Sequence, residues 1–153
     1  MPQEPTPGRL DHHYFYWLAV NWLALAQANG GGAGVQTPDV TYQQNRLLKI
    51  IAQAVYSVGI PWLIQPASTG TDNYYLYNIA TNLNTIVGSG NTVGPGRPDQ
   101  VYAYIIDKIL HGIVTGGSVT PIYAAPNQGD PFNVLLLKMD SLTYEILSGH
   151  IAL

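Results

Sequence analysis

The feature that most constrains the fold is a series of five apolar segments, each beginning near an Asp and ending at a Gly. The segments run from Asp11 to Gly30, Asp39 to Gly59, Asp72 to Gly88, Asp99 to Gly116 and Asp130 to Gly149. Asp is favoured at a helix start because its carboxylate accepts free amide hydrogens and suits the positive end of the helix dipole. Gly is favoured just past a helix end, where the backbone turns left-handed. The series therefore predicts five helices.

The side chains inside the middle segments recur with helical spacing. In the fourth segment, Val101, Ile105, Ile109 and Ile113 fall on one stripe, and the second and third segments show comparable stripes. Such stripes indicate amphipathic helices of ordinary length. The segments recur roughly every 30 residues, as structural repeats can. Because their side chains do not match one another, we expect the regular spacing of a bundle rather than a repeat architecture.

The first and fifth segments depart from this pattern. The first, from Tyr14 to Leu25, has almost no polar face, which is typical of a helix that is central in the fold or shared with another subunit. The fifth has helical spacing, but residues 133–139 are also an apolar run of strand length. We favour a helix there, with a β-hairpin near residues 119–139 as the alternative.

Residues 1–10 differ from the rest because they hold three prolines, which exclude a helix and favour an extended path. A chain of 153 residues suits one domain that can bury its own core without disulfides, and this chain has no Cys. The predicted organisation is an extended N-terminal arm at residues 1–10 and a single domain at residues 11–153. We expect that domain to be mainly α-helical, a compact bundle of about five helices with long loops.

Charged residues are scarce in this chain. Asp, Glu, Lys and Arg make up 10% of it, whereas about 25% is typical of soluble domains. Subunit interfaces are depleted in charge at their centres and enriched in aromatic side chains, and the chain holds 11 Tyr and 3 Trp. We therefore expect extensive contacts with copies of the same chain. The predicted interface residues are Pro2, Pro5, Pro7, Leu10, Tyr14, Trp17, Trp22 and Trp62.

Several classes of function are disfavoured by the same composition. A net charge of −3 and scattered basic residues argue against sequence-specific nucleic-acid binding, because phosphate binding needs clustered Lys and Arg. No segment reaches the roughly 20 apolar residues of a membrane span. The chain has two glycine-rich runs, at residues 30–34 and 88–96, and neither is followed by the Lys of a phosphate-binding loop. We expect no cofactor, no metal and no catalytic residues.

The sharpest local cluster is Asp11-His12-His13. It resembles the Asp-His-His motif of a family of metal-dependent phosphoesterases, whose further Asp-rich metal motifs are not found in this chain. Adjacent His residues at a helix start point in different directions, so a metal site would need ligands from elsewhere. We interpret the cluster as a capping Asp followed by two partly exposed His residues. The alternative is a small ligand-binding domain or a metal-dependent enzyme that uses His12 and His13.

These observations predict a non-enzymatic structural subunit of a homo-oligomer. Low charge, a Pro-rich arm and the lack of a catalytic set are typical of a component of a virus or bacteriophage particle. A head-tail connector, an adaptor or a capsid-stabilising protein would fit, in contact with copies of itself and with other structural proteins. The expected location is then the virion, and otherwise the cytoplasm.

Overall fold

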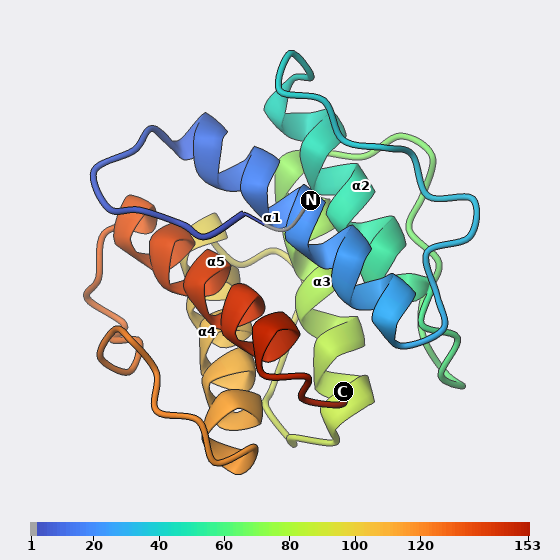
Figure 1. Cartoon of the computed structure of the whole chain (residues 1–153). Helices are drawn as coiled ribbons and strands as arrows, with labels where there is room; N and C mark the ends of the chain where they lie inside the picture. Colours follow the sequence, from blue (N-terminus) through green and yellow to red (C-terminus); the bar gives the residue numbers. More distant parts are fainter. Residues whose placement is uncertain (1–2) are drawn as a thin grey trace.

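A computed structural model describes residues 3–153, and within that range it contains five α-helices and no β-strand (Figure 1). The helices are α1 (Asp11–Ala28), α2 (Gln44–Tyr56), α3 (Asp72–Val87), α4 (Asp99–Gly116) and α5 (Phe132–Ser148). The predicted helical bundle is confirmed. Pro2, one of the predicted interface residues, lies outside the described residues.

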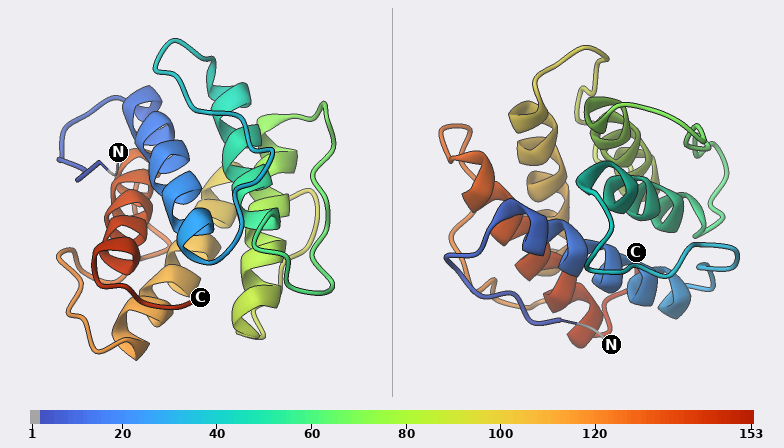
Figure 2. Two further views of the ribbon diagram at one scale, coloured as in Figure 1. Left: turned by 45° about the vertical axis from the view of Figure 1, so that its right-hand side comes forward. Right: turned by 90° about the horizontal axis from the view of Figure 1, so that it is seen from above.

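The five helices form a closed ring of parallel helices. Each helix packs against the next one in the chain, and α5 packs against α1 (Figure 2). All five run in the same direction, so their first residues gather at one end of the ring and their last residues at the other (Figure 1). We call these the N-terminal end and the C-terminal end of the ring.

The parallel arrangement explains the long loops. A connection between neighbouring parallel helices must return over a whole helix length, and α3, with 16 residues, is about 24 Å long at ~1.5 Å per residue. The connections at residues 29–43, 57–71, 88–98 and 117–131 make this return. At ~3.3 Å per extended residue even the shortest of them is long enough. Loop length here follows from topology and is no sign of a contact function by itself.

A cyclic set of side-chain hydrogen bonds joins the five first turns. Asn133 of α5 donates to the carbonyl oxygen of Arg9 at 3.0 Å and to the carboxylate of Asp11 at 2.7 Å, which closes the ring between α5 and α1. The second residue of each other helix bonds in a matching way to the segment that begins the next helix: His12 to Val40, Asn45 to Gly70 and Asp72, Asn73 to Arg97 and Asp99, and Gln100 to Asp130.

The Asp residues at the helix starts have a different role from the capping role that the sequence predicts. Asp11, Asp72 and Asp99 are the first helical residues, one position after the N-cap. Of the N-cap residues, Thr71 makes a side-chain capping bond. The Asp carboxylates instead accept the amides of the neighbouring helix. Their charge still lies in the first turn, where it suits the helix dipole.

Helix α2 begins later than its Asp suggests. Asp39 accepts hydrogen bonds from the backbone N–H of Thr41 at 2.8 Å and from its hydroxyl at 2.6 Å, which forms a local turn. The helix itself begins at Gln44. Asp binds its own backbone two residues on as readily as it caps a helix, so the Asp-to-Gly pattern predicts this element but misplaces its start.

A tyrosine near the beginning of three helices ties down the loop that precedes it. The hydroxyls of Tyr14, Tyr75 and Tyr102 donate to the carbonyl oxygens of Thr6, Ala67 and Gly94, each eight positions earlier. Residues 7–14 (PGRLDHHY) and 95–102 (PGRPDQVY) share five of eight identities across this unit. The expectation that side chains do not match between segments is therefore wrong at the helix starts.

The predicted extended arm at residues 1–10 is not supported, because residues 3–10 pack against the domain. Gln3 exchanges two hydrogen bonds with Asn21 of α1, one from its N–H at 2.7 Å and one to its carbonyl oxygen at 2.9 Å. Pro5 is buried. Asn21 is a fully buried polar residue on an otherwise apolar helix, and such a residue needs partners. The N-terminal segment supplies them.

The alternative β-hairpin near residues 119–139 is wrong. Residues 132–148 form α5, and residues 119–131 form an irregular connection without strand pairing. The apolar run at residues 133–139 supplies the face of α5 that lies in the ring, where Leu135 and Leu136 are completely buried. Helical spacing continues through Leu142 and Ile146 beyond this run, and that longer pattern decides for the helix.

Candidate functional site

Exposed charge is unevenly distributed over the ring. The last seven residues of each helix contain a single charged side chain, Glu145, which is only 6% exposed. The first turns and the residues just before them carry charged residues such as Arg9, Asp11, Arg97 and Asp99. No helix has a basic residue in its last turn, so no Lys or Arg neutralises the carbonyl ends there. The ring thus has a charged N-terminal end and an uncharged C-terminal end.

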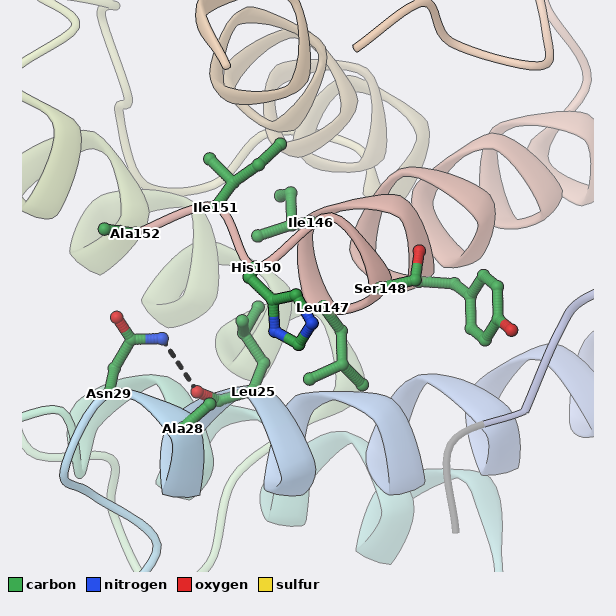
Figure 3. Close-up of a pocket in the computed structure, with 10 residues that line it drawn as sticks. Leu25, Ala28, Asn29, Ile146, Leu147, Ser148, His150, Ile151 and Ala152 are labelled. Carbon is green, nitrogen blue, oxygen red and sulfur yellow. Dashed lines mark hydrogen bonds between the residues drawn. The ribbon is translucent and has the colours of Figure 1, made fainter. Parts of the chain in front are cut away.

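A cavity of about 530 Å³ opens at the uncharged end, between the last turns of α1 and α5 (Figure 3). Figure 3 shows Leu147 and the His150 ring pointing from the α5 side toward Leu25 and Ala28 of α1. The polar groups around the cavity come mainly from Asn29, Tyr144, Ser148 and His150. The volume lies in the range of pockets that bind small apolar molecules, about 300–1,000 Å³. We call this cavity the α1–α5 pocket.

The walls of the α1–α5 pocket are held by hydrogen bonds of the chain beyond α5. The N–H of Ile151 donates to the carbonyl oxygen of Ile146 at 3.0 Å, and the N–H of Leu153 donates to Asn29 Oδ1 at 3.4 Å. His150 has a φ of 52°, a left-handed conformation that is uncommon for residues other than Gly. This turn brings residues 151–153 back over the end of the ring, so the pocket is preformed.

Trp62 projects from the α2–α3 connection. Its side chain is 87% exposed, and the exposed Pro61 and Ile64 lie beside it in the chain. Its φ of 75° is again left-handed, which costs about 1–3 kcal/mol for a residue other than Gly. A bulky apolar side chain held in solvent on a strained backbone is a candidate contact residue. We call residues 61–64 the Trp62 tip.

The base of the Trp62 tip is fixed by two buried asparagines of α3. Asn82 accepts a hydrogen bond from the N–H of Ile64 at 2.8 Å and donates to its carbonyl oxygen at 2.9 Å. Asn78 donates to the same carbonyl oxygen at 3.0 Å. Both asparagine side chains are almost completely buried. These bonds hold the tip in place against the strain at Trp62.

A smaller groove, of about 220 Å³, lies along the outer face of α1. Tyr16, Val20 and Leu23 line it on α1, and Thr37 and Pro38 line it on the connection that follows. The first segment was predicted to be apolar on almost all sides. This groove is a part of its apolar surface that is not covered by the rest of the chain. It contains no Asp, Glu, Lys or Arg.

The predicted interface residues are dispersed between the core and the surface. Pro5, Tyr14 and Trp22 are buried within the chain itself, Trp17 is half-buried, and Pro7, Leu10 and Trp62 are exposed. Tyr14 and Trp22 belong to the core of the ring, and Pro5 is buried in the segment before α1. An interface role for the exposed ones stays a prediction.

The two adjacent His residues, which would serve the metal-site alternative, have different surroundings. His12 Nε2 lies 2.6 Å from the carbonyl oxygen of Val40 as part of the cyclic set of bonds. His13 Nδ1 is buried without a hydrogen-bond partner among the described residues. Across residues 3–153, no three His, Asp or Glu side chains lie close enough together to hold a metal ion.

Two Asp carboxyl groups, in addition to that of Glu145, are buried. Both oxygens of Asp107 in α4 lack a hydrogen-bond partner within residues 3–153, and burial raises its pKa well above the usual value, against a smaller lowering by Lys138. Asp140 of α5 accepts a hydrogen bond from Asn21 at 2.9 Å. Burial raises the pKa of Asp140 too. Both groups are expected to be protonated over part of the range in which an exposed Asp is ionised.

The α1–α5 pocket was not found from the sequence. Its walls come from residues 25–29 and 144–152, near opposite ends of the chain, and no local pattern reports that these meet. The last turns of all five segments lack exposed charge, and this is visible in the sequence. That these turns lie together at one end follows only once the helices are known to be parallel.

No protein-family model, no curated protein and no solved structure matches the chain. Among the described residues, no helix combines the length and the apolar character that crossing a membrane requires.

Proposed function

We propose that the protein is a non-enzymatic structural subunit that assembles with copies of itself. The observation that carries this proposal is the uncharged C-terminal end of the ring, with its preformed pocket and its exposed Trp62. A surface without charge can be buried against a partner without the cost of removing ions from water. Interface centres have this composition, poor in charge and rich in Trp and Tyr.

The setting that the composition favours is a virus or bacteriophage particle, in which the protein would act as a head-tail connector, an adaptor or a capsid-stabilising component. In such a particle the charged end of the ring would remain available for water or for other structural proteins. The support for this setting is the low charge of the whole chain, 10%, and the location in the virion is part of the same proposal.

Measurement of the mass in solution tests the proposal. Native mass spectrometry and analytical ultracentrifugation across a hundredfold dilution should show a defined assembly that dissociates on dilution. The ultracentrifugation is repeated at low and at high salt. Because few charges lie at the uncharged end, the assembly should persist at about 1 M salt, where interactions between exposed charges are screened beyond ~3 Å. A monomer at every concentration contradicts the proposal.

A small helical ligand-binding domain is the second candidate, and the α1–α5 pocket is the observation that favours it. This pocket lies at the opposite end of the ring from His12 and His13, so the candidate no longer depends on those residues. The same experiment separates the two functions. A monomer whose unfolding temperature rises with an apolar aromatic compound such as indole supports ligand binding instead of assembly.

A further inference from the structure

We propose that the Trp62 tip of one copy inserts into the α1–α5 pocket of a neighbouring copy. This inference rests on the proposed function, because it requires that copies of the chain associate. It goes further by naming both halves of the contact. The occupant of the pocket is then a side chain of the same protein.

The Trp62 side supplies the inserted group. The indole is 87% exposed, so it does not occupy the pocket of its own chain. Two residues further on, the backbone of Ile64 is held by Asn78 and Asn82, which limits the motion of the backbone at the base of the tip. Trp is among the residues that most often dominate interface energies, and such residues act by filling a pocket on the partner.

The pocket side matches an indole in size and chemistry. An indole is smaller than the drug-sized ligands that cavities of this volume hold, and Leu25, Leu147 and Ile151 provide apolar contacts. An inserted Trp places its N–H among polar groups, and the Ser148 hydroxyl at the pocket is one acceptor within the same wall. Neither the tip nor the pocket contains Asp, Glu, Lys or Arg, so none of these side chains is buried when the two surfaces meet.

The two halves of the contact are different patches of the same chain. The Trp62 tip belongs to the connection between α2 and α3, whereas the pocket lies between α5 and α1. Two arrangements satisfy this contact. In a two-fold dimer each tip fills the pocket of the other copy, and in a head-to-tail arrangement each copy uses its tip on one neighbour and its pocket on another, which generates a closed ring of subunits or an open filament.

A complementation experiment tests this geometry. Trp62→Ala removes the tip but keeps the pocket, and Ala28→Lys places a charged amine at the pocket but keeps the tip. Ala28 is exposed at the end of α1, where a Lys suits the helix dipole and does not disturb folding. Each variant alone should associate at least about 30-fold more weakly than the natural protein, the effect of losing one dominant interface residue. An equimolar mixture should form dimers that contain one copy of each variant, because one intact contact remains between them.

Matched controls change the same chemistry elsewhere. Ile122→Ala removes another exposed apolar side chain, 65% exposed, from a different connection. Ser68→Lys adds the same charge at an exposed position just before α3, near the charged N-terminal end of the ring. Both controls should assemble like the natural protein. Trp62→Gly provides a second tip variant, because Gly accepts the left-handed backbone and so keeps the fold.

The outcomes separate the inference from the proposed function. If the natural protein assembles and Trp62→Ala and Trp62→Gly assemble equally well, the inference is overturned while the proposed function stands. If the tip variants are monomeric but the mixture with Ala28→Lys forms no mixed dimer, Trp62 binds elsewhere and the inference is again overturned. If the natural protein is monomeric throughout, both fail. Mixed dimers from two monomeric variants support the inference.

Discussion

The two ends of the helix ring are built by different means. At the N-terminal end, a side chain from the second residue of every helix bonds to the segment that begins the next helix, and charged residues surround these bonds. At the C-terminal end exposed charge is absent, and the chain turns through left-handed conformations. The described residues other than Gly with positive φ are Trp62, Ser118 and His150, and all three follow the last turn of a helix.

This difference teaches how a parallel ring can be specified. Five parallel helices align their dipoles side by side, which is unfavourable unless charges at the ends compensate. Asp residues in the first turns of α1, α3 and α4 compensate at one end, and the amides that bond to them fix the order of the helices. With the order fixed there, the other end is free to hold strain and an open pocket. Structural specification and the proposed contact surface thus occupy opposite ends.

The largest expected effect is on the pH dependence of the free energy of unfolding. The buried Asp107 should change it in one direction and a hydrogen-bonded carboxylate of the charged end in the other. The pKa of Asp107 is raised by burial, so the folded protein retains a proton that the unfolded chain loses near pH 4. Between that pH and the raised pKa, the free energy of unfolding should fall as pH rises, by about 1.4 kcal/mol per pH unit for one group. Asp107→Asn cannot ionise, so urea unfolding from pH 4 to 7 should show a flatter profile.

The pKa of Asp130 is shifted in the opposite direction from that of Asp107, so its effect on stability has the opposite dependence on pH. The hydrogen bond from Lys138, at 2.8 Å, and the backbone N–H of Asn127 lower its pKa. Its contribution to stability is therefore present above the usual Asp pKa and is lost as the pH falls below it. Asp130→Asn should therefore lower the free energy of unfolding above about pH 4, and its difference from the natural protein should shrink as the pH falls below that value. A slope between pH 4 and 7 that is identical in Asp107→Asn and the natural protein would contradict the role given to Asp107.

A smaller effect tests whether the cyclic bonds hold the charged end together. Asn133→Ala removes both bonds that close α5 onto α1, and one of them has a charged acceptor. The free energy of unfolding should fall by about 1.5 kcal/mol, as for hydrogen bonds to charged groups. Gln27→Ala, an exposed amide near the end of α1, is the matched control and should change it by less than about 0.5 kcal/mol. If the two variants lowered the free energy of unfolding equally, the cyclic bonds would not be what stabilises the charged end.

Much of the helical content could be predicted from the sequence because it is set locally. Apolar spacing in residues 101–113 and the Gly at position 88 report on one helix at a time, and both helices form as expected. The parallel arrangement could not be predicted in this way. It depends on Asn133 reaching Asp11 from the far end of the chain, and a single Asn beside a Pro-rich turn reads as an ordinary helix start. The matching PGR units at residues 7–9 and 95–97 were the available signal.

The interface residues predicted from the sequence fall into an exposed group and a buried group. Trp62 was predicted as an interface residue from the low charge and aromatic content of the chain, and it is exposed. Tyr14 and Trp22 were predicted on the same grounds but are buried, because aromatic side chains favour a core as readily as an interface. Sequence composition alone does not tell whether an aromatic side chain lies in the core or at an interface. The separation comes from the ring, which turns one face of α1 inward and leaves another, with Tyr16 and Val20, uncovered.

The smallest expected effect examines the strain at the uncharged end. Trp62→Gly and Trp62→Ala both remove the indole, but only Gly adopts a φ of 75° without cost. Under dilute, monomeric conditions Trp62→Gly should be more stable than Trp62→Ala by about 1 kcal/mol, the penalty of a left-handed residue that has a Cβ atom. Thermal unfolding measures the difference. A Gly variant no more stable than the Ala variant would mean that the backbone at Trp62 relaxes once the indole is gone. A more stable Gly variant that fails to assemble would show that the strain is maintained for contact and not for folding.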